Sequence, residues 1–423
     1  MKNTVKSTVR LIAALIITVM LMTSMTSCFF FDFGFDLDEF FEDNFNQNPD
    51  GDNPPDDEGG NGNQGGGTTD DPVDEDLSFI PSGDATADSA TALNRALLST
   101  VVVESRFSSG PAYGSGVIYQ LDSNLGSAYI ITNCHVVYDS VDGFCGDVNV
   151  YLYGMELQRY AIDATVVGGS VTYDIAILKV TNSEVLKNAV CTKAAFGNSD
   201  DVGVFDSVYA IGNPEAQGIA VTKGIVSVAS EYLELTGADD SSIELRVIRT
   251  DAAVNGGNSG GGLYNEQGQL VGIVSAKLIG SEIDNMGYAI PANLVKCIID
   301  NLIDNYDGTN VSSVKRVLLG VTITSRTMGV VVDGETGEVK KVGIVEVDSV
   351  NADALVAGKV QKGDVITSLT VDGVTVNPTQ IYHVTDHMLT ARVGNMVELM
   401  VDRNGEAVRV TFVVEAGKIT TVK

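Results

Sequence analysis

Basic residues are scarce in this 423-residue sequence: 26 Lys and Arg stand against 56 Asp and Glu, for a formal net charge of -30. Proteins that bind nucleic acid need basic surfaces to neutralise phosphates, so this balance argues against that class. The excess acid is uneven, because residues 29–88 hold 18 Asp and Glu and no Lys or Arg. Solubility accounts for an acidic surface of this kind.

Long apolar runs are also lacking. The run Leu11–Met22 is shorter than the roughly 20 residues that a membrane-spanning helix needs. It follows a basic start and precedes small polar residues, which is the arrangement of a signal peptide. The segment ends in "SMTSC", which resembles the cleavage box of bacterial lipoproteins. The resemblance implies a signal peptide over residues 1–28, lipidation of Cys28, and a membrane-anchored protein at the cell surface or in the periplasm; ordinary secretion is the alternative.

Cysteine is rare. Beyond Cys28 there are four, Cys134, Cys145, Cys191 and Cys297, and their spacing matches no paired C-x-x-C metal pattern. Four cysteines outside the cytoplasm allow three disulfide pairings. We expect buried free thiols, with a Cys134–Cys145 bridge as the alternative.

The chain divides into a polar segment and two folded regions. Residues 29–90 are rich in Gly, Asn, Asp and Pro and are expected to form a disordered acidic tether. Within it, residues 29–45 alternate Phe with acid; this part could contact a membrane or a partner, and we favour a loosely collapsed tether. The folded regions are expected at 91–306 and 314–423.

Short runs rich in Val and Ile dominate the first folded region, for example "STVVVES", "SAYIITN" and "IAILKV". Such runs between turn residues predict an all-β sandwich or barrel. Helical spacing over 293–306 predicts a helix that closes this region. In the second region we expect strands, a helix over 378–389 and a hairpin turn at Asn404-Gly405.

Histidine is limited to three positions. His383 and His387 lie one turn apart on the helix expected in the second region, but without a third ligand in view we expect a solvated or groove-lining role and no metal site. His135 directly follows a strand-like run in "ITNCHVV". Asp174 opens the apolar strand of "YDIAILKV", and Ser259 lies in the glycine-rich "TDAAVNGGNSGGGLY".

The order His, Asp, Ser is one in which nucleophilic triads occur. A serine hydroxyl becomes a nucleophile when an imidazole takes its proton, and a buried carboxylate keeps that imidazole in the correct tautomer. We therefore predict His135 as general base, Asp174 as its orienting carboxylate and Ser259 as nucleophile. The N–H groups of Gly257 and Ser259 are predicted to form the oxyanion hole, since glycine-rich backbone can turn its amides inward.

These motifs carry a family resemblance over about half of the chain. Residues 91–306 resemble the trypsin-like protease domain of the HtrA, or Deg-type, family through "TNCHVV", "DIAILKV", "AIGNPEAQGIAVTKGIVSVAS", "TDAAVNGGNSGGGL" and "LVGIVSA…GYAIP". The resemblance implies a mostly β, chymotrypsin-like double β-barrel. It also implies a serine endopeptidase that cuts unfolded or misfolded polypeptides without metal or cofactor, and a homotrimer.

Residues 314–423 resemble the PDZ domain that follows such proteases, an α+β fold with a partly open β-barrel. The matching segments are "RVLLGVTI" and "GIVEVDSVNADALVAGKVQKGDVITSLTVDGVTV". The resemblance implies that a peptide C-terminus adds as an extra strand beside the helix over 378–389. The loop that binds its carboxylate would be formed by Leu318, Leu319, Gly320 and Val321.

Two features set expectations beyond the family pattern. Gly256 and Gly262 stand where the family usually has proline, and glycine frees the chain where proline restrains it. We expect the oxyanion loop to be often misformed at rest and to be ordered by substrate or an activator. A small apolar specificity pocket is expected from Ala253, Val274, Ser275 and Ala276, which would accept small apolar residues and reject Lys and Arg.

Two other functions compete with proteolysis. One is a PDZ peptide-binding adaptor or chaperone whose protease site is dormant; the altered oxyanion loop favours it and the complete triad opposes it. The other is an esterase with the same triad chemistry. The chain order and the absence of a G-x-S-x-G nucleophile elbow oppose the esterase, because the glycines around Ser259 lie between two strand-like segments and not at a turn from strand to helix.

Overall fold

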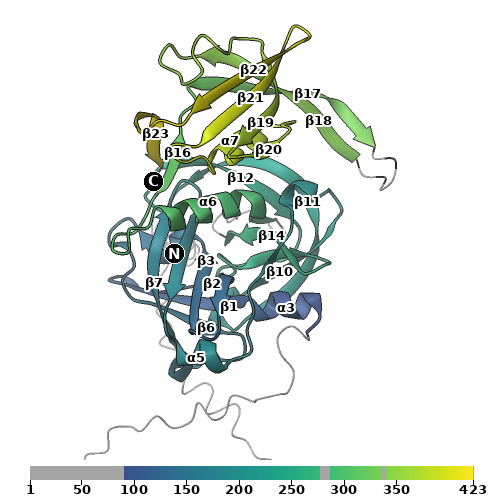
Figure 1. Cartoon of the computed structure of the whole chain (residues 1–423). Coiled ribbons are helices and arrows are strands. Elements are labelled where there is room, and N and C mark those ends of the chain that lie inside the picture. The colour runs from purple at the N-terminus through teal and green to yellow at the C-terminus, as the bar shows by residue number, and fades with distance from the viewer. Residues whose placement is uncertain (1–89, 277–285, 333, 335–336, 338, 423) are drawn as a thin grey trace, which may run out of the picture. The chain divides into compact units, whose positions relative to one another are not determined.

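The computed structural model describes residues 90–276, 286–332, 334, 337 and 339–422. The predicted signal peptide, Cys28 and all of the tether except Ala90 lie outside these residues. Within the described part, the chain is mostly β-structure (Figure 1), as the sequence predicts. No helix there is long and apolar enough to span a membrane.

Six strands of the first region close into an antiparallel barrel in the order β1-β2-β3-β8-β7-β6. Their bounds are β1 Thr100–Phe107, β2 Gly110–Asp122, β3 Ser127–Thr132, β6 Val148–Leu152, β7 Ile162–Ser170 and β8 Ile175–Val180. Branched apolar side chains fill the interior, and those of Val101, Ile118 and Ile130 have no solvent exposure. These are β-formers at strand positions, so local preference and burial agree.

A second barrel follows in the same region. Its ring runs β13-β10-β11-β12-β15-β14, and β13 pairs with β14 to close it. The bounds are β10 Ser207–Gly212, β11 Ala220–Thr236, β12 Ser242–Thr250, β13 Gly262–Asn265, β14 Gln269–Val274 and β15 Gly287–Pro291, with β9 Ala195–Phe196 added beside β14. The predicted double barrel is therefore confirmed.

Short elements connect the strands of the two barrels. They are the helices α3 Ala92–Leu98, α4 Cys134–Val137 and α5 Glu184–Asn188, the small strands β4 Tyr138–Asp139 and β5 Gly143–Phe144, and the 3-10 turns η3 Gln158–Tyr160, η4 Ser199–Asp201 and η5 Pro214–Ala216. Helix α3 is absent from the sequence prediction. It begins after Thr91, whose hydroxyl accepts a hydrogen bond from the Asn94 N–H at 3.4 Å, as N-cap threonines do.

Helix α6, Ala292–Asp304, lies where the sequence predicts a helix over 293–306. Its apolar side chains recur at helical spacing, and Val295, Ile298, Ile299 and Leu302 are fully buried in the largest core cluster. The helix therefore closes the first region by packing one face on the barrels.

The second region has its own sheet, in the order β17-β18-β19-β21-β22 with β20 beside β19, and a separate pair β16-β23. The bounds are β16 Val314–Val317, β17 Val321–Val332, β18 Val339–Val350, β19 Val365–Val371, β20 Val374–Val376, β21 Met396–Arg403, β22 Glu406–Val413 and β23 Ile419–Val422, with helix α7 Ile381–Met388 and turn η7 Ala416–Lys418. The predicted helix and hairpin are both present. Asn404 and Gly405 join β21 to β22 with φ of 56° and 89°, the left-handed pair that a tight hairpin requires.

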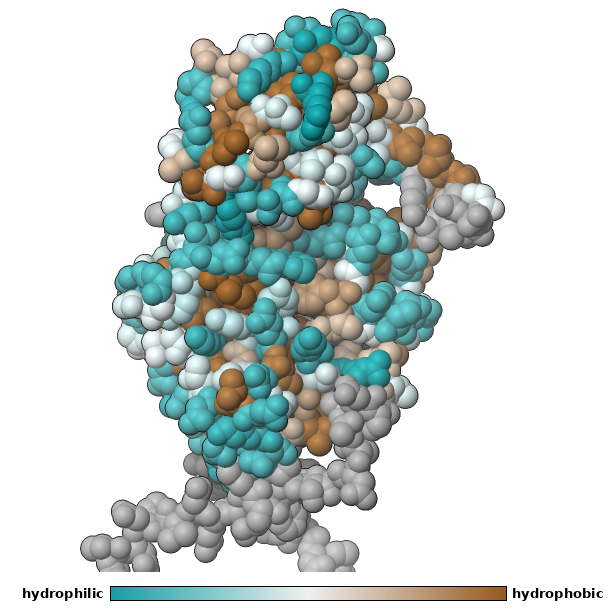
Figure 2. All heavy atoms as spheres, viewed as in Figure 1, coloured by the Kyte–Doolittle hydropathy of each residue, from teal (hydrophilic) through white to brown (hydrophobic). Residues whose placement is uncertain are grey.

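The far part of the β17–β18 hairpin extends beyond the rest of its sheet (Figure 1). Met328, Val330 and Val332 on β17 and Val339 on β18 are each more than 60% exposed. Figure 2 shows an apolar patch at this hairpin. The exposure explains why this valine-rich segment adds no residues to the core of the second region.

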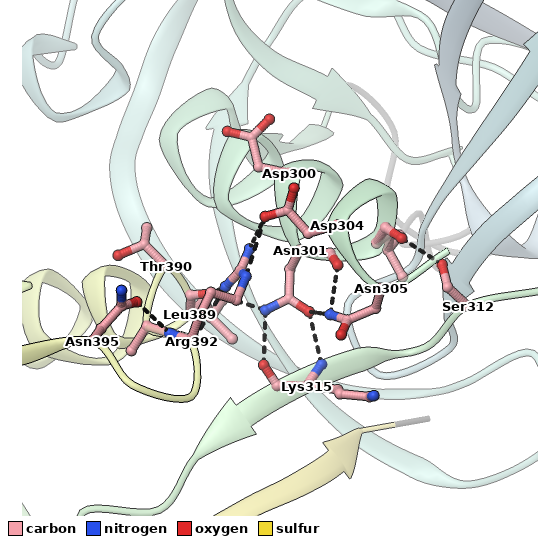
Figure 3. Close-up of polar contacts among 12 residues, drawn as sticks. Asp300, Asn301, Asp304, Asn305, Ser312, Lys315, Leu389, Thr390, Arg392 and Asn395 are labelled. Carbon is pink, nitrogen blue, oxygen red and sulfur yellow. Dashed lines mark hydrogen bonds and ion pairs between the residues drawn. The ribbon is translucent and has the colours of Figure 1, made fainter. Parts of the chain in front are cut away.

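The buried side chain of Asn301 joins three segments (Figure 3). From α6, its amide donates to the carbonyl oxygens of Lys315 in β16 and Leu389 at the end of α7, both at 2.8 Å. Its own oxygen accepts from the Lys315 N–H at 2.8 Å. Arg392 adds an ion pair with Asp304 at 2.9 Å. One amide thus ties the first region to the second.

Replacement of Asn301 by leucine is expected to lower the free energy of unfolding by about 3 kcal/mol, since it removes three hydrogen bonds from this buried junction. The carbonyl and N–H of Lys315 lose their Asn301 partner, whereas the Leu389 carbonyl keeps the hydrogen bond from Arg392. Urea unfolding followed by circular dichroism measures the change. The exposed Asn188, at the end of α5, provides the control. Asn188→Leu should change stability by less than about 0.5 kcal/mol. Equal stability of Asn301→Leu and the wild type would contradict the assignment of this residue as a junction.

A second junction is centred on Arg246 of β12. Its guanidinium forms an ion pair with Asp386 of α7 at 2.6 Å and lies 3.7 Å from the carboxylate of Asp200. The guanidinium also stacks over the ring of Tyr382, with the Arg246 Cζ atom 4.0 Å from the ring centre. The Arg246 side chain is 4% exposed. Burial raises the pKa of Asp386 to about 6, against the opposing pull of Arg246, and burial lowers the pKa of the neighbouring His383.

The raised pKa of Asp386 predicts a pH dependence of stability. Because the folded protein binds this proton more tightly than the unfolded chain, the carboxyl favours folding below about pH 4, and that contribution is lost as the pH rises to about 6. Asp386→Asn removes the titration. The stability of this variant relative to wild type should therefore rise by roughly 2 to 3 kcal/mol between pH 4 and pH 7. If the variant instead loses stability relative to wild type over that range, the ion pair with Arg246 outweighs the burial.

The four cysteines of the described chain form no disulfide, so the alternative Cys134–Cys145 bridge is absent, and Cys145, Cys191 and Cys297 are free thiols as expected. Cys134, Cys145 and Cys191 are buried. Burial raises the pKa of Cys191 to about 11 and that of Cys297 to about 12, so both thiols stay protonated at neutral pH.

Candidate active site

His135 and Asp174 meet at the end of the first barrel. The ring of His135, on the short helix α4 after β3, places Nδ1 2.9 Å from both carboxylate oxygens of Asp174. The backbone N–H of His135 also donates to Asp174 Oδ1 at 3.1 Å. A carboxylate accepting from Nδ1–H leaves Nε2 unprotonated in the neutral ring, which is the form that a general base needs.

Local backbone explains how Asp174 reaches the ring. The residue has a φ of 49° directly before β8, and aspartate is one of the few residues that adopt this left-handed region readily. Its carbonyl accepts from the side-chain amide of the buried Asn133 at 2.8 Å. The Asp174 side chain is 8% exposed, so its charge interacts chiefly with the ring and the groups around it.

Ser275 is a third partner of the carboxylate. Its hydroxyl, fully buried, donates to Asp174 Oδ2 at 3.0 Å. The sequence predicts this residue as part of the specificity pocket wall, whereas its side chain points to the acid. Its effect is to hold the second carboxylate oxygen in place.

Ser259 lies beside these groups and is 5% exposed. Its hydroxyl accepts from the N–H of Ala276, the residue after Ser275, at 3.1 Å, and its carbonyl accepts from the Ser115 N–H at 2.8 Å. Within the described residues, no hydrogen bond joins the Ser259 hydroxyl to His135. Catalytic hydrogen bonds are often long without substrate. The structure therefore places the three predicted residues in one site, with the His–Asp hydrogen bond formed.

The predicted oxyanion loop is held at several points. The carbonyl of Gly256 accepts from the Glu215 N–H at 2.8 Å, and the carbonyl of Gly257 accepts from the Ser115 hydroxyl at 2.7 Å. The N–H groups of Gly257 and Ser259 have no acceptor in the part of the chain that the structure describes. Two backbone donors within three residues of the chain are thus available to a ligand.

Glycine is required at parts of this loop for different reasons. Gly257 has a φ of 88°, and a Cβ there would lie 2.2 Å from the Asn213 carbonyl oxygen. At Gly262 a Cβ would lie 2.3 Å from the ring of the buried Tyr264. The sequence interpretation treats Gly262 only as a source of freedom, and the structure adds a packing reason for it. A Cβ on Gly256 would meet open space, so freedom remains its one role.

The other predicted pocket residues are less clearly placed. Ala253 is exposed, and its carbonyl accepts from Thr222 at 2.8 Å. Val274 is 1% exposed and packs in the core cluster of the second barrel. Ala276 is half-buried beside Ser259. The pocket stays a prediction for these three residues.

In the second region, Leu319 is buried, Leu318 is half exposed, and Gly320 has a φ of 73° before β17. The Leu318 N–H donates a hydrogen bond to the Lys418 carbonyl at 2.9 Å. His387 is buried, with its Nε2 3.0 Å from the Val374 carbonyl oxygen. Burial lowers its pKa.

Sequence reasoning misses Ser115 and Glu215. Ser115 is a fully buried serine inside β2, where its hydroxyl donates to the Gly257 carbonyl and its N–H donates to the Ser259 carbonyl. A serine between two glycines in a strand, "GSG", is the one sequence feature that could have marked it. Glu215 acts through its backbone, so its side-chain type carries no such signal.

Comparisons with known proteins agree with this geometry. A trypsin-like peptidase domain model matches residues 114–273. Serine protease Do-like HtrB of Bacillus subtilis is 38% identical over 209 residues, which is 49% of this chain and 41% of that protein. Serine protease Do-like HtrA of Lactobacillus helveticus is 34% identical over 70% of this chain and 66% of its own length. Periplasmic serine endoprotease DegP of Escherichia coli is 36% identical over 61% of this chain and 48% of its own.

A solved structure of the HtrA-type protease AlgW with a tripeptide superposes with a TM-score of 0.50 at 27% identity, covering 78% of this chain and 96% of that one. The chain belongs to the HtrA family of trypsin-like serine proteases. In the HtrB comparison, the matched segment spans less than half of the relative's length. The HtrA family assignment accounts for the two barrels and for the place of His135, Asp174 and Ser259 between them.

Proposed function

We propose that this HtrA-family chain is a serine endopeptidase that works through an acyl-enzyme on Ser259. The observation that carries the proposal is the His135–Asp174 hydrogen bond at 2.9 Å. Ser259 lies close to this pair, because its hydroxyl accepts from the N–H of Ala276, and the preceding residue, Ser275, donates to the Asp174 carboxylate. His135 takes the proton of Ser259 as the hydroxyl attacks the peptide carbonyl, and Asp174 stabilises the resulting imidazolium. His135 then donates that proton to the leaving amine, and water completes the cycle by the same route.

The charge that develops on the carbonyl oxygen is stabilised by the N–H groups of Gly257 and Ser259 in this proposal. Removal of one such donor typically costs 10² to 10³ in turnover. Small apolar residues are the proposed specificity, because Ala253, Val274 and Ala276 carry no acid that could pair with Lys or Arg. In this proposal, the loop conformation that leaves both N–H groups without an acceptor is the catalytic one. We further propose that only part of the protein adopts this conformation at rest, and that substrate or an activator orders the loop.

The proposed substrates are unfolded or misfolded polypeptides outside the cytoplasm. The basic and apolar start of the chain and the periplasmic location in the name of the relative DegP support export. Anchoring through a lipid on Cys28, and assembly as a homotrimer, are the finer parts of this proposal.

The second region is proposed to be a PDZ domain over residues 314–423 that binds peptide C-termini. Strand β17 pairs only with β18 among the described strands, so one edge is free for an added strand. Gln380, at the start of α7, lies 3.2 Å from Ser325 of β17. The N–H groups of Leu319 and Gly320 have no acceptor within the described chain, which suits a carboxylate. A fluorescent peptide ending in a free apolar carboxyl terminus should bind, and the amidated peptide should not.

Digestion of β-casein tests the proteolytic function. The full-length wild type should degrade casein, whereas Ser259→Ala should not, while keeping the same unfolding temperature. Casein that stays intact with the wild type, in the presence and absence of C-terminal peptides, would instead favour an adaptor or chaperone. Equal digestion by Ser259→Ala would show that the nucleophile lies elsewhere.

A further inference from the structure

A strained turn lies directly against the oxyanion loop. In η5, Glu215 has φ of 54° and ψ of 26°, and the next residue, Ala216, has φ of 57°. Eight non-glycine residues of the described chain have positive φ, and five of them are Asp or Asn, which tolerate this region. Glu215 and Ala216 do not belong to that class, and they are adjacent. The turn therefore holds two consecutive unfavourable conformations.

The strain is maintained by hydrogen bonds to the surrounding structure. The N–H of Asn213, at the start of the turn, donates to the Ser115 hydroxyl at 2.8 Å. The side-chain oxygen of Asn213 accepts from the Gly218 N–H at 2.8 Å and so closes the turn. Asn213 is 1% exposed. Strained backbone persists only where surrounding contacts fix it, and it is concentrated at functional sites.

The same turn fixes the peptide that carries a predicted oxyanion donor. The Glu215 N–H holds the Gly256 carbonyl at 2.8 Å. Because the carbonyl and N–H of one peptide point in opposite directions, this contact directs the Gly257 N–H away from the turn. The next carbonyl, of Gly257, is held by the Ser115 hydroxyl, which in turn accepts from Asn213.

We propose that the Glu215–Ala216 turn is a positioning element for the oxyanion hole, and that its strain limits how much of the protein holds Gly257 in the catalytic orientation. The proposal rests on the proposed function, because it assigns the Gly257 N–H to the oxyanion. When the turn relaxes, the Glu215 N–H leaves the Gly256 carbonyl and the peptide between Gly256 and Gly257 is free to rotate. Relief of the strain therefore favours the catalytic state.

Replacement of Ala216 by glycine tests this directly, since glycine adopts φ near 57° without strain and keeps the backbone hydrogen bonds. In the full-length protein, Ala216→Gly should raise kcat on a quenched peptide with valine before the cleaved bond three- to fivefold, with KM within twofold. The rate of labelling by a fluorophosphonate, whose phosphoryl oxygen occupies the same hole, should rise equally. Glu215→Gly should act in the same direction, and Ala216→Val should lower both rates at least tenfold.

Phe205 provides the matched control, because it is a 79% exposed non-glycine residue with φ of 78° and takes no part in the hydrogen bonds that hold the oxyanion loop. Phe205→Gly should leave kcat and labelling unchanged, even where it raises the unfolding temperature. Unchanged rates in Ala216→Gly, or an equal gain in Phe205→Gly, would overturn the proposal. A Ser259→Ala variant that is still labelled would show instead that the proposed nucleophile is wrong.

Discussion

Asp174→Asn is expected to lower proteolytic turnover about 10⁴-fold, with little change in KM. The carboxylate accepts from His135 Nδ1, from the His135 backbone N–H and from the Ser275 hydroxyl. An asparagine amide has only one acceptor oxygen, so its NH₂ group must face one of these donors. If the NH₂ group faces Nδ1 of His135, the ring must accept there and carry its proton on Nε2. That tautomer cannot accept the serine proton.

The measurement is kcat and KM on a quenched peptide, with the exposed Asp163 of β7 as control. Asp163→Asn makes the same chemical change outside the site and should leave turnover within twofold. A loss of less than tenfold in Asp174→Asn, with the fold intact, would show that the carboxylate does not orient the base.

Gly257→Ala is expected to reduce turnover by 10² to 10³. The new Cβ would lie 2.2 Å from the Asn213 carbonyl oxygen and 2.9 Å from the Glu215 nitrogen, and φ of 88° is itself strained for alanine. The loop must shift to accept the methyl group, and its displacement carries the Gly257 N–H away from the oxyanion position. Because the defect is in transition-state stabilisation, kcat should fall while KM changes little.

The adjacent glycine is the control for this change. A Cβ on Gly256 meets nothing within 4 Å, so Gly256→Ala should keep turnover within a few fold of wild type. Equal activity of Gly257→Ala and Gly256→Ala would mean that the Gly257 N–H is not an oxyanion donor.

The sequence predicted a β-rich first region from its residue patterns and the double barrel from its family resemblance, and it named His135 and Asp174, which the structure brings within hydrogen-bond distance. Alternation of Val and Ile runs with turns predicted the strands, and "TNCHVV", "DIAILKV" and "GGNSGGG" each marked one part of the site because its chemistry restricts the residue type. Helix α3 was missed since seven residues carry a weak periodic pattern, although Thr91 is a regular N-cap.

The supports of the site could not be predicted in this way. Ser115 contacts Gly257 across 142 residues of sequence, and Ser275 contacts Asp174 across 101. These contacts depend on how the two barrels bring distant strands together, which no local pattern encodes. The left-handed conformation of Glu215 and Ala216 is set by hydrogen bonds to that surrounding structure, against the preference of both residues.

Fluorophosphonate labelling followed by peptide mass spectrometry tests the central claim, that His135 activates Ser259. The full-length wild type should carry the label on Ser259 alone, and His135→Ala should slow labelling at least 100-fold while its circular dichroism spectrum is unchanged. Label on another residue, or labelling of His135→Ala at the wild-type rate, would contradict it.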